Sequence, residues 1–401
     1  MSHVMAQDRV HHSLVWPKCR ACGEARVEPL LAERSVPLYC NVLWEDRARA
    51  VEAPRGPLRL SVCPSCGHVY NEAFISDLLD YTPAYENSLH YSPHFSGYAE
   101  DLARSLVDKY RLHGRFVVDV GCGHGDFLAL VCRLGGNRGR GYDRSCPLDA
   151  EAIARDLDVA FVPEFFSRAV ELPAIDLLCC RQVLEHIADP AAFLAEITAS
   201  PAVTGETVLF FEVPNAAYTF EDDGIWDLIY EHCSYFTARS LVALFERCGL
   251  EVIATRDLYS GQYLGIEARP APGARAVRPG SLAPATAKNE PFAERYRSKL
   301  ARWQDAVAGW AAAGERIVIW GAGSKGVGFL DALRPAAVAY AVDLNPRKRG
   351  RFLPASGAEV IAPEFLPEYR PDRVILMNPV YRTEVSDLLA RLGLSPALVA
   401  A

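Results

Sequence analysis

The chain of 401 residues lacks a surplus of positive charge, a long apolar run and a secretory-type N-terminus. Lysine and arginine number 42 against 50 acidic residues, and a formal net charge of -8 argues against nonspecific binding to nucleic acid. No apolar run reaches the roughly 18–20 residues of a membrane-spanning helix. Residues 1–8 contain no basic segment followed by an apolar one, as a signal peptide would. We therefore expect a cytoplasmic protein with neither nucleic acid nor membrane as a partner.

Cysteine is plentiful, and most of the twelve cysteines are scattered, as expected for small buried side chains in a reducing compartment. Four form two Cys-x-x-Cys-Gly pairs, Cys19 with Cys22 and Cys63 with Cys66. Each pair can direct two thiolates at one ion, and two pairs complete a tetrahedral site, so the spacing predicts a structural Zn²⁺. Cys40 and His68 are substitute ligands in this hypothesis. Buried or redox-active thiols are the interpretation without a metal.

The length predicts two or three domains, because domains contain about 100–200 residues each. We predict a zinc-binding N-terminal domain over 1–75, an α/β core over 76–268 and a C-terminal Rossmann-like domain over 289–401. A linker is expected over 269–288, which is rich in proline, alanine, glycine and arginine and shows no periodicity. The aromatic and polar residues 81–95, before the first core strand, are placed to cover a ligand site.

Residues 117–125, Val-Val-Asp-Val-Gly-Cys-Gly-His-Gly, are the most informative stretch. An apolar run leads into Asp119, and glycines follow at Gly121, Gly123 and Gly125. Glycine lets the backbone turn sharply and lets a ligand approach, because no Cβ stands in the way. A strand, such a turn and a following helix predict the first βα unit of a nucleotide-type α/β domain.

Two later segments continue this pattern. Asp143 ends a predicted second strand, where a carboxylate can bond both ribose hydroxyls of an adenosine. Residues 175–187, Ile-Asp-Leu-Leu-Cys-Cys-Arg-Gln-Val-Leu-Glu-His-Ile, indicate a fourth strand, a turn and a helix start, with Glu185 and His186 lining the pocket without a catalytic role. Together the segments resemble class I S-adenosylmethionine methyltransferases. The resemblance implies donor binding by Asp119, Gly121, Gly123, Gly125, Asp143 and Gln182.

A second glycine turn follows the apolar run Ile-Val-Ile-Trp in the C-terminal part of the chain. Its pattern, Gly321-x-Gly323-x-x-Gly326 with Asp343 after the next strand, formally matches a dinucleotide fingerprint, so NAD binding is one interpretation. Lys325 argues against that role, because it places a cation where phosphates meet the helix N-terminus.

The order of cysteine pairs, methyltransferase motifs and C-terminal turn resembles the sugar C-methyltransferase family. The likeness covers essentially the whole chain and includes residues 342–354 and the dipeptide Asn378-Pro379. These enzymes methylate a carbon of a nucleotide-linked 4-keto-deoxysugar. The resemblance implies that the acceptor is held by Gly323, Lys325, Asp343 and Asn378.

Carbon methylation beside a ketone requires a base that removes an α-proton, and histidine titrates in a suitable range. The family carries a Tyr-His-Glu-His-x-Ser-Tyr-Phe segment, which aligns with Tyr230-Glu231-His232-Cys-Ser-Tyr-Phe here with one residue missing. The alignment implies that His232 is the base, that Glu231 orients it or binds substrate, and that Tyr230 contributes to the site. A packed or capping histidine is the alternative interpretation.

Two other functions remain open at this point. An O- or N-methyltransferase acting on another small metabolite would need no enolate and no base of this kind. A nucleotide-sugar-binding protein without catalysis is the second alternative, although the acidic residues Asp119 and Asp143 argue against it. The expected partner is a nucleotide sugar or another small-molecule acceptor, and the expected assembly is a monomer or a homodimer.

Overall fold

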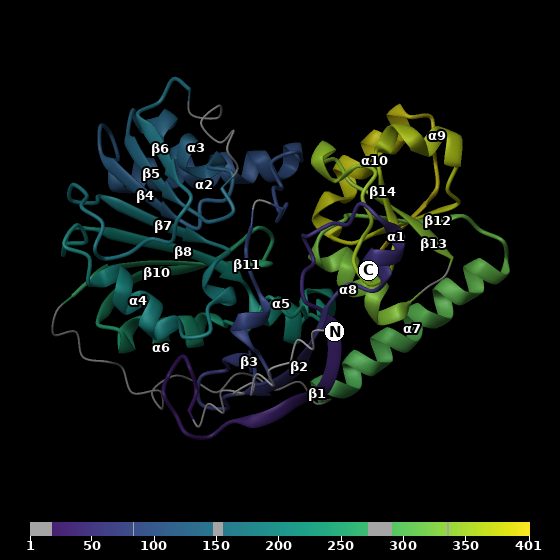
Figure 1. The fold of residues 1–401 in the computed structure, drawn as a ribbon, viewed down its shortest axis with the longest axis horizontal. Helices are drawn as coiled ribbons and strands as arrows, with labels where there is room; N and C mark the ends of the chain where they lie inside the picture. The colour runs from purple at the N-terminus through teal and green to yellow at the C-terminus, as the bar shows by residue number, and fades with distance from the viewer. Residues whose placement is uncertain (1–17, 83, 147–154, 272–290, 335–336) are drawn as a thin grey trace, which may run out of the picture.

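The computed structural model describes residues 18–82, 84–146, 155–271, 291–334 and 337–401. Residues 1–17 of the predicted N-terminal domain and 272–288 of the predicted linker lie outside these ranges. Three sheets organise the described residues (Figure 1). In the view of Figure 1 the largest sheet fills the left lobe, a second sheet fills the right lobe, and the N-terminal sheet lies beneath both.

The N-terminal sheet has four antiparallel strands in the order β1-β2-β3-β9. Its elements are β1 (Glu28–Pro37), helix α1 (Arg47–Val51), β2 (Arg55–Val62), β3 (Val69–Asn71), the 3₁₀ turn η1 (Ser76–Leu78) and β9 (Ser234–Tyr235). Strand β9 comes from the middle of the chain, and Tyr235 pairs with Val69. The sheet therefore extends beyond the predicted domain of residues 1–75 and fixes the segment that contains His232.

The core sheet has seven strands in the order β10-β11-β8-β7-β4-β5-β6. They are β4 (Phe116–Val120), β5 (Arg138–Tyr142), β6 (Val159–Val162), β7 (Leu177–Arg181), β8 (Val208–Pro214), β10 (Leu250–Leu258) and β11 (Tyr263–Pro270). Strands β4 to β8 are parallel, whereas β11 runs antiparallel between β8 and β10. Residues 209–213 of β8 are all buried, as expected for a parallel strand covered on both faces.

Helices cover the core sheet on both faces. They are α2 (Pro93–Tyr110), α3 (Asp126–Gly135), α4 (Pro190–Thr198), α5 (Ala216–Phe220) and α6 (Ala238–Arg247), with 3₁₀ turns η3 (Leu184–His186) and η4 (Ile225–Asp227). Helix α2 begins after Ser92, whose hydroxyl accepts from the Phe95 amide. Its Leu102 and Leu106 pack with Leu128 of α3 in one hydrophobic cluster.

The C-terminal domain is built on five parallel strands in the order β14-β13-β12-β15-β16. The strands are β12 (Ile317–Trp320), β13 (Val338–Val342), β14 (Glu359–Ile361), β15 (Arg373–Leu376) and β16 (Ala397–Ala400). The helices are α7 (Phe292–Ala312), α8 (Ser324–Leu333), α9 (Leu366–Tyr369) and α10 (Arg382–Arg391), with 3₁₀ turns η6 (Pro346–Lys348), η7 (Pro363–Phe365) and η8 (Pro379–Tyr381). This is a Rossmann-like half-unit, as the sequence predicted.

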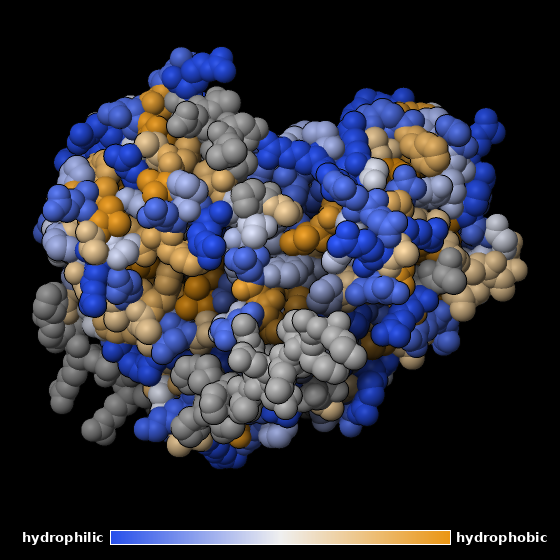
Figure 2. All heavy atoms as spheres, in the orientation of Figure 1, coloured by the Kyte–Doolittle hydropathy of each residue, from blue (hydrophilic) through white to orange (hydrophobic). Residues whose placement is uncertain are grey.

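The N-terminal sheet and the C-terminal domain share one hydrophobic cluster, in which Leu58 belongs to the same packed group as Phe329. Arg55 reinforces the junction by donating to both carboxylate oxygens of Asp331, at 2.8 and 3.0 Å. On the face in Figure 2, hydrophilic residues cover most of the outer edge, and hydrophobic ones show chiefly over the core sheet and between the lobes. Among the described helices, none is both long and apolar enough to cross a membrane.

Candidate active site

A cavity of about 340 Å³ lies where the core, the segment before α2 and the C-terminal domain meet. Its walls are the turns after β4 and β7, the turn after β12 and residues from Tyr85 to Phe95. The carboxyl ends of parallel strands from both sheets face this cavity, which is where open α/β sheets bind ligands. The segment that was expected to cover a ligand site therefore forms one side of it.

The turn after β4 holds three glycines in the left-handed conformation, with φ of 76° at Gly121, 53° at Gly123 and 88° at Gly125. A Cβ on Gly121 would lie 2.2 Å from Val183, and a Cβ on Gly125 would lie 2.2 Å from Phe161. A Cβ on Gly123 would meet nothing within 4 Å, because this residue borders the cavity. The turn is therefore an open cradle beside the N-terminus of α3.

The two acidic residues predicted to bind the donor have different surroundings. Asp119 lines the cavity, and its buried Oδ1 has no hydrogen-bond partner within the described part of the chain. Burial raises its pKa to about 7, against the opposing effect of Arg181. Asp143 does not line the cavity; its Oδ2 accepts from the Gly123 amide at 2.8 Å and its Oδ1 from the Ser145 amide at 2.7 Å. An unpartnered buried carboxylate oxygen beside an open glycine cradle fits the ammonium and adenosine of S-adenosylmethionine.

Gln182 also lines the cavity, at a φ of 56°, and its side chain donates to Glu212 at 3.1 Å. Sequence reasoning missed its neighbour Arg181, whose guanidinium donates to the same carboxylate at 3.0 Å and lies over the Phe127 ring, 4.0 Å from the centroid. The Tyr98 hydroxyl also donates to Glu212. A charged residue at the end of a buried apolar strand was the available signal, since a buried charge needs a partner.

A second cluster faces the cavity from the loops after β7 and α5. One side-chain atom from each of Glu185, His186 and His232 lies within 4.8 Å of the others. The two imidazole rings meet edge to face, 5.0 Å apart and at 76°. Nδ1 of His186 lies 3.0 Å from the carbonyl oxygen of Glu231 and 3.0 Å from the Tyr81 hydroxyl. Because a carbonyl only accepts, we assign the proton to Nδ1, which leaves Nε2 as an acceptor.

His232 is buried in the cavity wall, and its Nδ1 has no hydrogen-bond partner among the described residues. Burial and, to a smaller extent, the nearby ammonium of Lys325 lower its pKa to about 4. The imidazole is therefore neutral at pH 7 and can accept a proton. This is the state that the predicted base requires.

The two residues before His232 face away from the cavity. Tyr230 is fully buried against the N-terminal sheet, and its hydroxyl contacts both the amide and the carbonyl of Ile75, at 2.9 and 3.1 Å. Oε2 of Glu231 accepts from the Cys40 amide at 2.8 Å. The catalytic assignment of Tyr230 is therefore corrected to a structural one, because strand β9 turns this side chain away. Glu231 reaches the site through its carbonyl, which contacts His186, and through its carboxylate, which contacts the cavity-lining Tyr85.

The predicted acceptor residues lie on the opposite wall. Lys325 donates to Gln262 at 2.7 Å and lies 3.2 Å from a carboxylate oxygen of Asp227, so its ammonium bridges the two domains. Asn378 exchanges hydrogen bonds of 2.8 and 3.0 Å with the same Gln262. Gly323 borders the cavity in an extended conformation, with φ of −112°. Lys325 and Asn378 thus contact the core, and the ammonium of Lys325 lies near enough to the predicted base to act on it.

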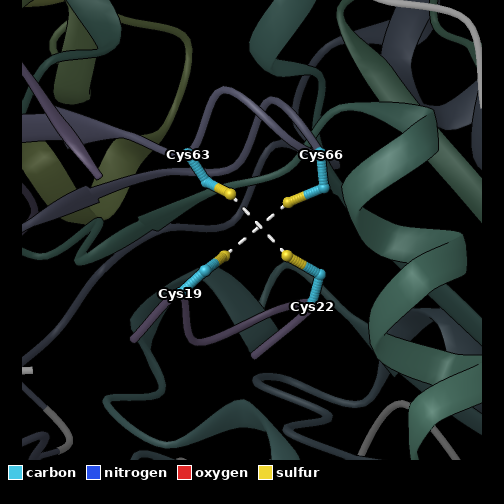
Figure 3. A group of neighbouring side chains, drawn as sticks. All are labelled: Cys19, Cys22, Cys63 and Cys66. Carbon is cyan, nitrogen blue, oxygen red and sulfur yellow. Dashed lines mark hydrogen bonds between the residues drawn. The ribbon is translucent and has the colours of Figure 1, made fainter. Parts of the chain in front are cut away.

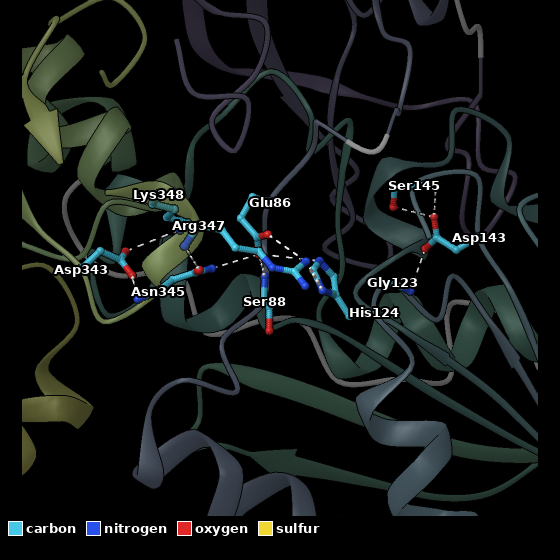
Figure 4. A network of polar contacts seen from close by, with 10 residues as sticks. All are labelled: Glu86, Ser88, Gly123, His124, Asp143, Ser145, Asp343, Asn345, Arg347 and Lys348. Atoms are coloured by element: carbon cyan, nitrogen blue, oxygen red, sulfur yellow. Dashed lines mark hydrogen bonds and ion pairs between the residues drawn. The ribbon is translucent and has the colours of Figure 1, made fainter. Parts of the chain in front are cut away.

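Asp343 lines the cavity at the end of β13 and is already engaged (Figure 4). Its carboxylate accepts from the amides of Ala322 and Asn345, at 3.0 and 2.9 Å. Nζ of Lys348, whose side chain is 3 % exposed, lies 3.5 Å from the same carboxylate. The carboxylate of Asp343 is therefore held by two amides and lies beside a buried ammonium.

A polar network joins the donor turn to the C-terminal domain (Figure 4). Glu86, from the segment before α2, accepts from the Asn345 side chain at 2.9 Å and lies 3.6 Å from Nε2 of His124. The Arg347 guanidinium donates to Nδ1 of His124 at 3.0 Å and lies 3.6 Å from Glu86. His124 belongs to the glycine turn, so both ligand-binding walls of the cavity share one set of contacts.

The four cysteines predicted to bind zinc point at a common centre (Figure 3). The Sγ–Sγ distances are 3.6 Å for Cys19 with Cys66 and for Cys22 with Cys63. A tetrahedron with Zn–S bonds of about 2.3 Å has edges of about 3.8 Å, so the thiols fit this ion. The substitute ligands play other parts: His68 lies 3.8 Å from Sγ of Cys19 as a hydrogen-bond partner, and Cys40 contacts Glu231.

The fold and this cavity define an S-adenosylmethionine-dependent methyltransferase of class I. Comparisons with known proteins agree: residues 94–255 match a family described as "Methyltransferase domain", and residues 285–393 match a "C-methyltransferase C-terminal domain". The chain therefore carries a methyltransferase domain followed by the C-terminal domain of C-methyltransferases, and it is a methyltransferase that uses S-adenosylmethionine.

The chain is 28% identical over 397 residues to the C-methyltransferase NovU of Streptomyces niveus, covering 92% of this chain and 91% of that protein. With the C-terminal domain match, this relationship supports methylation at carbon. Among solved structures, an O-methyltransferase family protein from Burkholderia thailandensis aligns with a TM-score of 0.34 and 20% identity, over 45% of this chain and 59% of its own. Magnesium protoporphyrin IX methyltransferase from Synechocystis PCC 6803, bound to S-adenosylhomocysteine, aligns with a TM-score of 0.35 and 16% identity, over 44% and 84%.

Proposed function

We propose that the chain methylates a carbon atom next to the ketone of a nucleotide-linked keto-deoxysugar, with His232 as the base. The observation that carries the proposal is that the donor turn, His232 and the C-terminal turn all line the same cavity. Methyl transfer requires the acceptor carbon to lie between the methyl donor and the base, so the acceptor must bind in the same cavity. The C-terminal wall supplies polar groups for that acceptor on the side opposite the donor turn.

In this proposal His232 takes the α-proton of the acceptor and becomes an imidazolium. Its buried, unpartnered Nδ1 and lowered pKa of about 4 supply an empty proton-accepting position at neutral pH. When bound, S-adenosylmethionine supplies the electrophilic methyl group. Asp119 would hold its ammonium, the glycines of the donor turn would border it, and Asp143 would keep that turn in place or reach its ribose. The segment from Tyr85 to Phe95 would exclude water.

The acceptor would be held by the C-terminal wall. Lys325 offers a cation, Gly323 offers open backbone, and Asn378 offers an amide beside Gln262. An acceptor phosphate would have to compete with Asp227 for the Lys325 ammonium, because the two already lie 3.2 Å apart. Asp343 would contribute by holding the turn through the Ala322 amide.

The test uses a panel of thymidine- and uridine-diphosphate-linked 4-keto-6-deoxyhexoses. We expect one of them to raise the melting temperature in the presence of S-adenosylhomocysteine, because ligands that bind only the native state stabilise it. His232→Ala should bind both ligands yet lose about 10²–10⁴-fold in methyl transfer and lose exchange of the acceptor's α-hydrogen with deuterated water. Tyr230→Phe is the matched control, and it should keep the exchange. Full turnover by His232→Ala would favour O- or N-methylation.

We also propose that the four-cysteine cluster binds one structural Zn²⁺. Cys63→Ser should lose the metal and lower the melting temperature by more than about 5 °C, because structural zinc contributes directly to folding. Cys40→Ser, a buried cysteine outside the cluster, is the control and should retain zinc. Elemental analysis of both variants gives the metal content, and freshly purified wild-type protein without stoichiometric metal would contradict the proposal.

A further inference from the structure

Glu185 has no task in the base mechanism, yet its position is unusual. It lies on η3, lines the cavity, and both carboxylate oxygens are buried without a hydrogen-bond partner among the described residues. Burying a polar group without a partner costs free energy unless a ligand completes it. The sequence indicated a residue that lines the pocket, and Glu185 does line the cavity.

A ligand group that forms a hydrogen bond with Glu185 must lie close to His232. Glu185 belongs to the group in which the side-chain atoms lie within 4.8 Å of one another. A ligand oxygen between two atoms so separated can reach both at hydrogen-bond distance. The neutral Nε2 of His186 lies 3.9 Å from Oε1 of Glu185 and presents a lone pair to it. A lone pair at that position favours a protonated carboxyl over a carboxylate.

The surroundings of Glu185 oppose a negative charge. Burial, and to a smaller extent the carboxylate of Glu212, raise its pKa to about 8 against the opposing effect of a backbone hydrogen bond. The titratable groups that act on it or lie beside it come from every neighbouring element: Tyr81, Cys180, His186, Glu212, His232 and Cys233. Burial shifts His232 the opposite way, to a pKa of about 4. Two adjacent groups with pKa values shifted apart are the pattern of an acid and a base with separate tasks.

We propose that Glu185 is a catalytic residue that stays protonated and donates a hydrogen bond to the acceptor's carbonyl oxygen as that oxygen becomes an enolate. This inference rests on the proposed function. His232 removes the α-proton, the C–H electron pair forms a C=C bond, and the C=O π pair moves onto the oxygen that Glu185 contacts. The enolate carbon then bonds to the methyl carbon, the carbon–sulfur pair leaves on sulfur, and the C=O bond re-forms. Glu185 keeps its proton throughout, and His232 releases the α-proton to solvent.

Two substitutions distinguish a hydrogen-bond donor at position 185 from a negatively charged carboxylate at that position. Glu185→Gln keeps the shape and offers an N–H donor, so it should retain methyl transfer within about tenfold. Glu185→Leu removes the donor and should lose about 10²–10³-fold, which is typical for the loss of one oxyanion donor. Calorimetry with S-adenosylhomocysteine shows whether each variant keeps a folded donor site. A carboxylate acting as a second base or a metal ligand would make Glu185→Gln as damaging as Glu185→Leu, and that result would overturn the proposal.

Two further measurements do not depend on turnover. Infrared difference spectra between wild type and Glu185→Gln should contain a protonated carboxyl C=O band that disappears as pH rises through about 8, the pKa given above. Exchange of the α-hydrogen in the keto-deoxyhexose probe, measured with S-adenosylhomocysteine in place of the donor, should fall above the same pH in wild type but not in Glu185→Gln. An ionised carboxylate at pH 7, or a stoichiometric metal whose removal from this cluster stops exchange, would overturn the proposal.

Failure of the proposed function has a different signature. If the enzyme does not methylate carbon, wild type will not exchange the α-hydrogen at all, whatever the state of Glu185. If wild type exchanges, His232→Ala does not and Glu185→Leu does so at the wild-type rate, the base assignment stands and the role of Glu185 is wrong.

Discussion

The donor turn after β4 and the turn after β12 have the same layout, yet the aspartate that follows each turn has different partners. In both, a carboxylate at the end of the next strand accepts from a turn amide, Asp143 from Gly123 and Asp343 from Ala322 (Figure 4). Asp143 is held by amides and a serine hydroxyl, whereas Asp343 also has the buried ammonium of Lys348. A shared motif therefore does not imply a shared ligand, because a neighbouring cation changes the charge that the carboxylate presents and because Asp343 lines the cavity whereas Asp143 does not.

The glycines differ as well. All three in the donor turn are left-handed, and Gly123 opens onto the cavity. In the C-terminal turn Gly321 also has a positive φ, of 114°, but Gly323 is extended, and a Cβ on Gly326 would lie 2.2 Å from the carbonyl oxygen of Gly321. The donor turn therefore opens onto the cavity at a left-handed glycine, whereas the C-terminal turn opens at an extended one and adds the side chain of Lys325.

The largest effect should come from closing the donor turn. Gly125→Ala combines a φ of 88° with a Cβ 2.2 Å from Phe161, so the turn must move. We expect at least a hundredfold loss of S-adenosylhomocysteine affinity in calorimetry, with a lower melting temperature. Gly323→Ala is the control in the other turn, because its nearest new neighbour would be Asn41 at 3.9 Å. Equal losses in both variants would mean that the donor occupies both turns.

Replacing Asp143 should weaken donor binding, whereas replacing Asp343 should lower the stability of the protein. Asp143→Ala should weaken S-adenosylhomocysteine about ten- to a hundredfold, because it removes the carboxylate that holds the donor turn. Asp343→Ala should leave donor affinity unchanged but destabilise the protein by about 3 kcal/mol, because it removes the negative charge beside the buried Lys348 ammonium and leaves that ammonium only the Ala322 carbonyl as an acceptor. Calorimetry and denaturant unfolding measure the two effects.

The double variant Asp343→Asn with Lys348→Met provides the check, because it removes both charges together. It should recover part of the lost stability. If it is no more stable than Asp343→Ala, the ion pair is not what distinguishes the two turns.

The smallest expected effect is a pH dependence confined to the donor turn. Burial raises the pKa of Asp119 to about 7 in the free protein, and an ammonium ligand would lower it again. Binding then requires the carboxylate, so S-adenosylhomocysteine affinity should rise about tenfold between pH 6 and pH 8, with proton release on binding. Asp119→Asn should bind more weakly and without this pH dependence. A pH-independent wild-type affinity would contradict the assignment.

The His232 segment shows where reading by alignment failed. Tyr230, Glu231 and His232 are consecutive, and the family pattern gave all three a place in the site. Only His232 lines the cavity with its side chain, because β9 pairs with β3 of the N-terminal sheet and turns Tyr230 toward Ile75. Such a long-range strand pair leaves no local signal, since a two-residue strand is too short for alternation to be recognised.

The amino-acid sequence alone determined the features that depend on local backbone chemistry and spacing. Left-handed glycines after an apolar strand specify the donor turn, and paired Cys-x-x-Cys-Gly motifs specify a four-thiol site, because each is set within a few residues. The tertiary structure decided which side chains share a cavity and in which ionisation state. The raised pKa of Glu185 arises from burial and from Glu212, which is close in space but distant in the sequence, so no local pattern encodes it. Lys348 stands only five residues after Asp343, but the burial of its ammonium depends on the packing of the whole C-terminal domain.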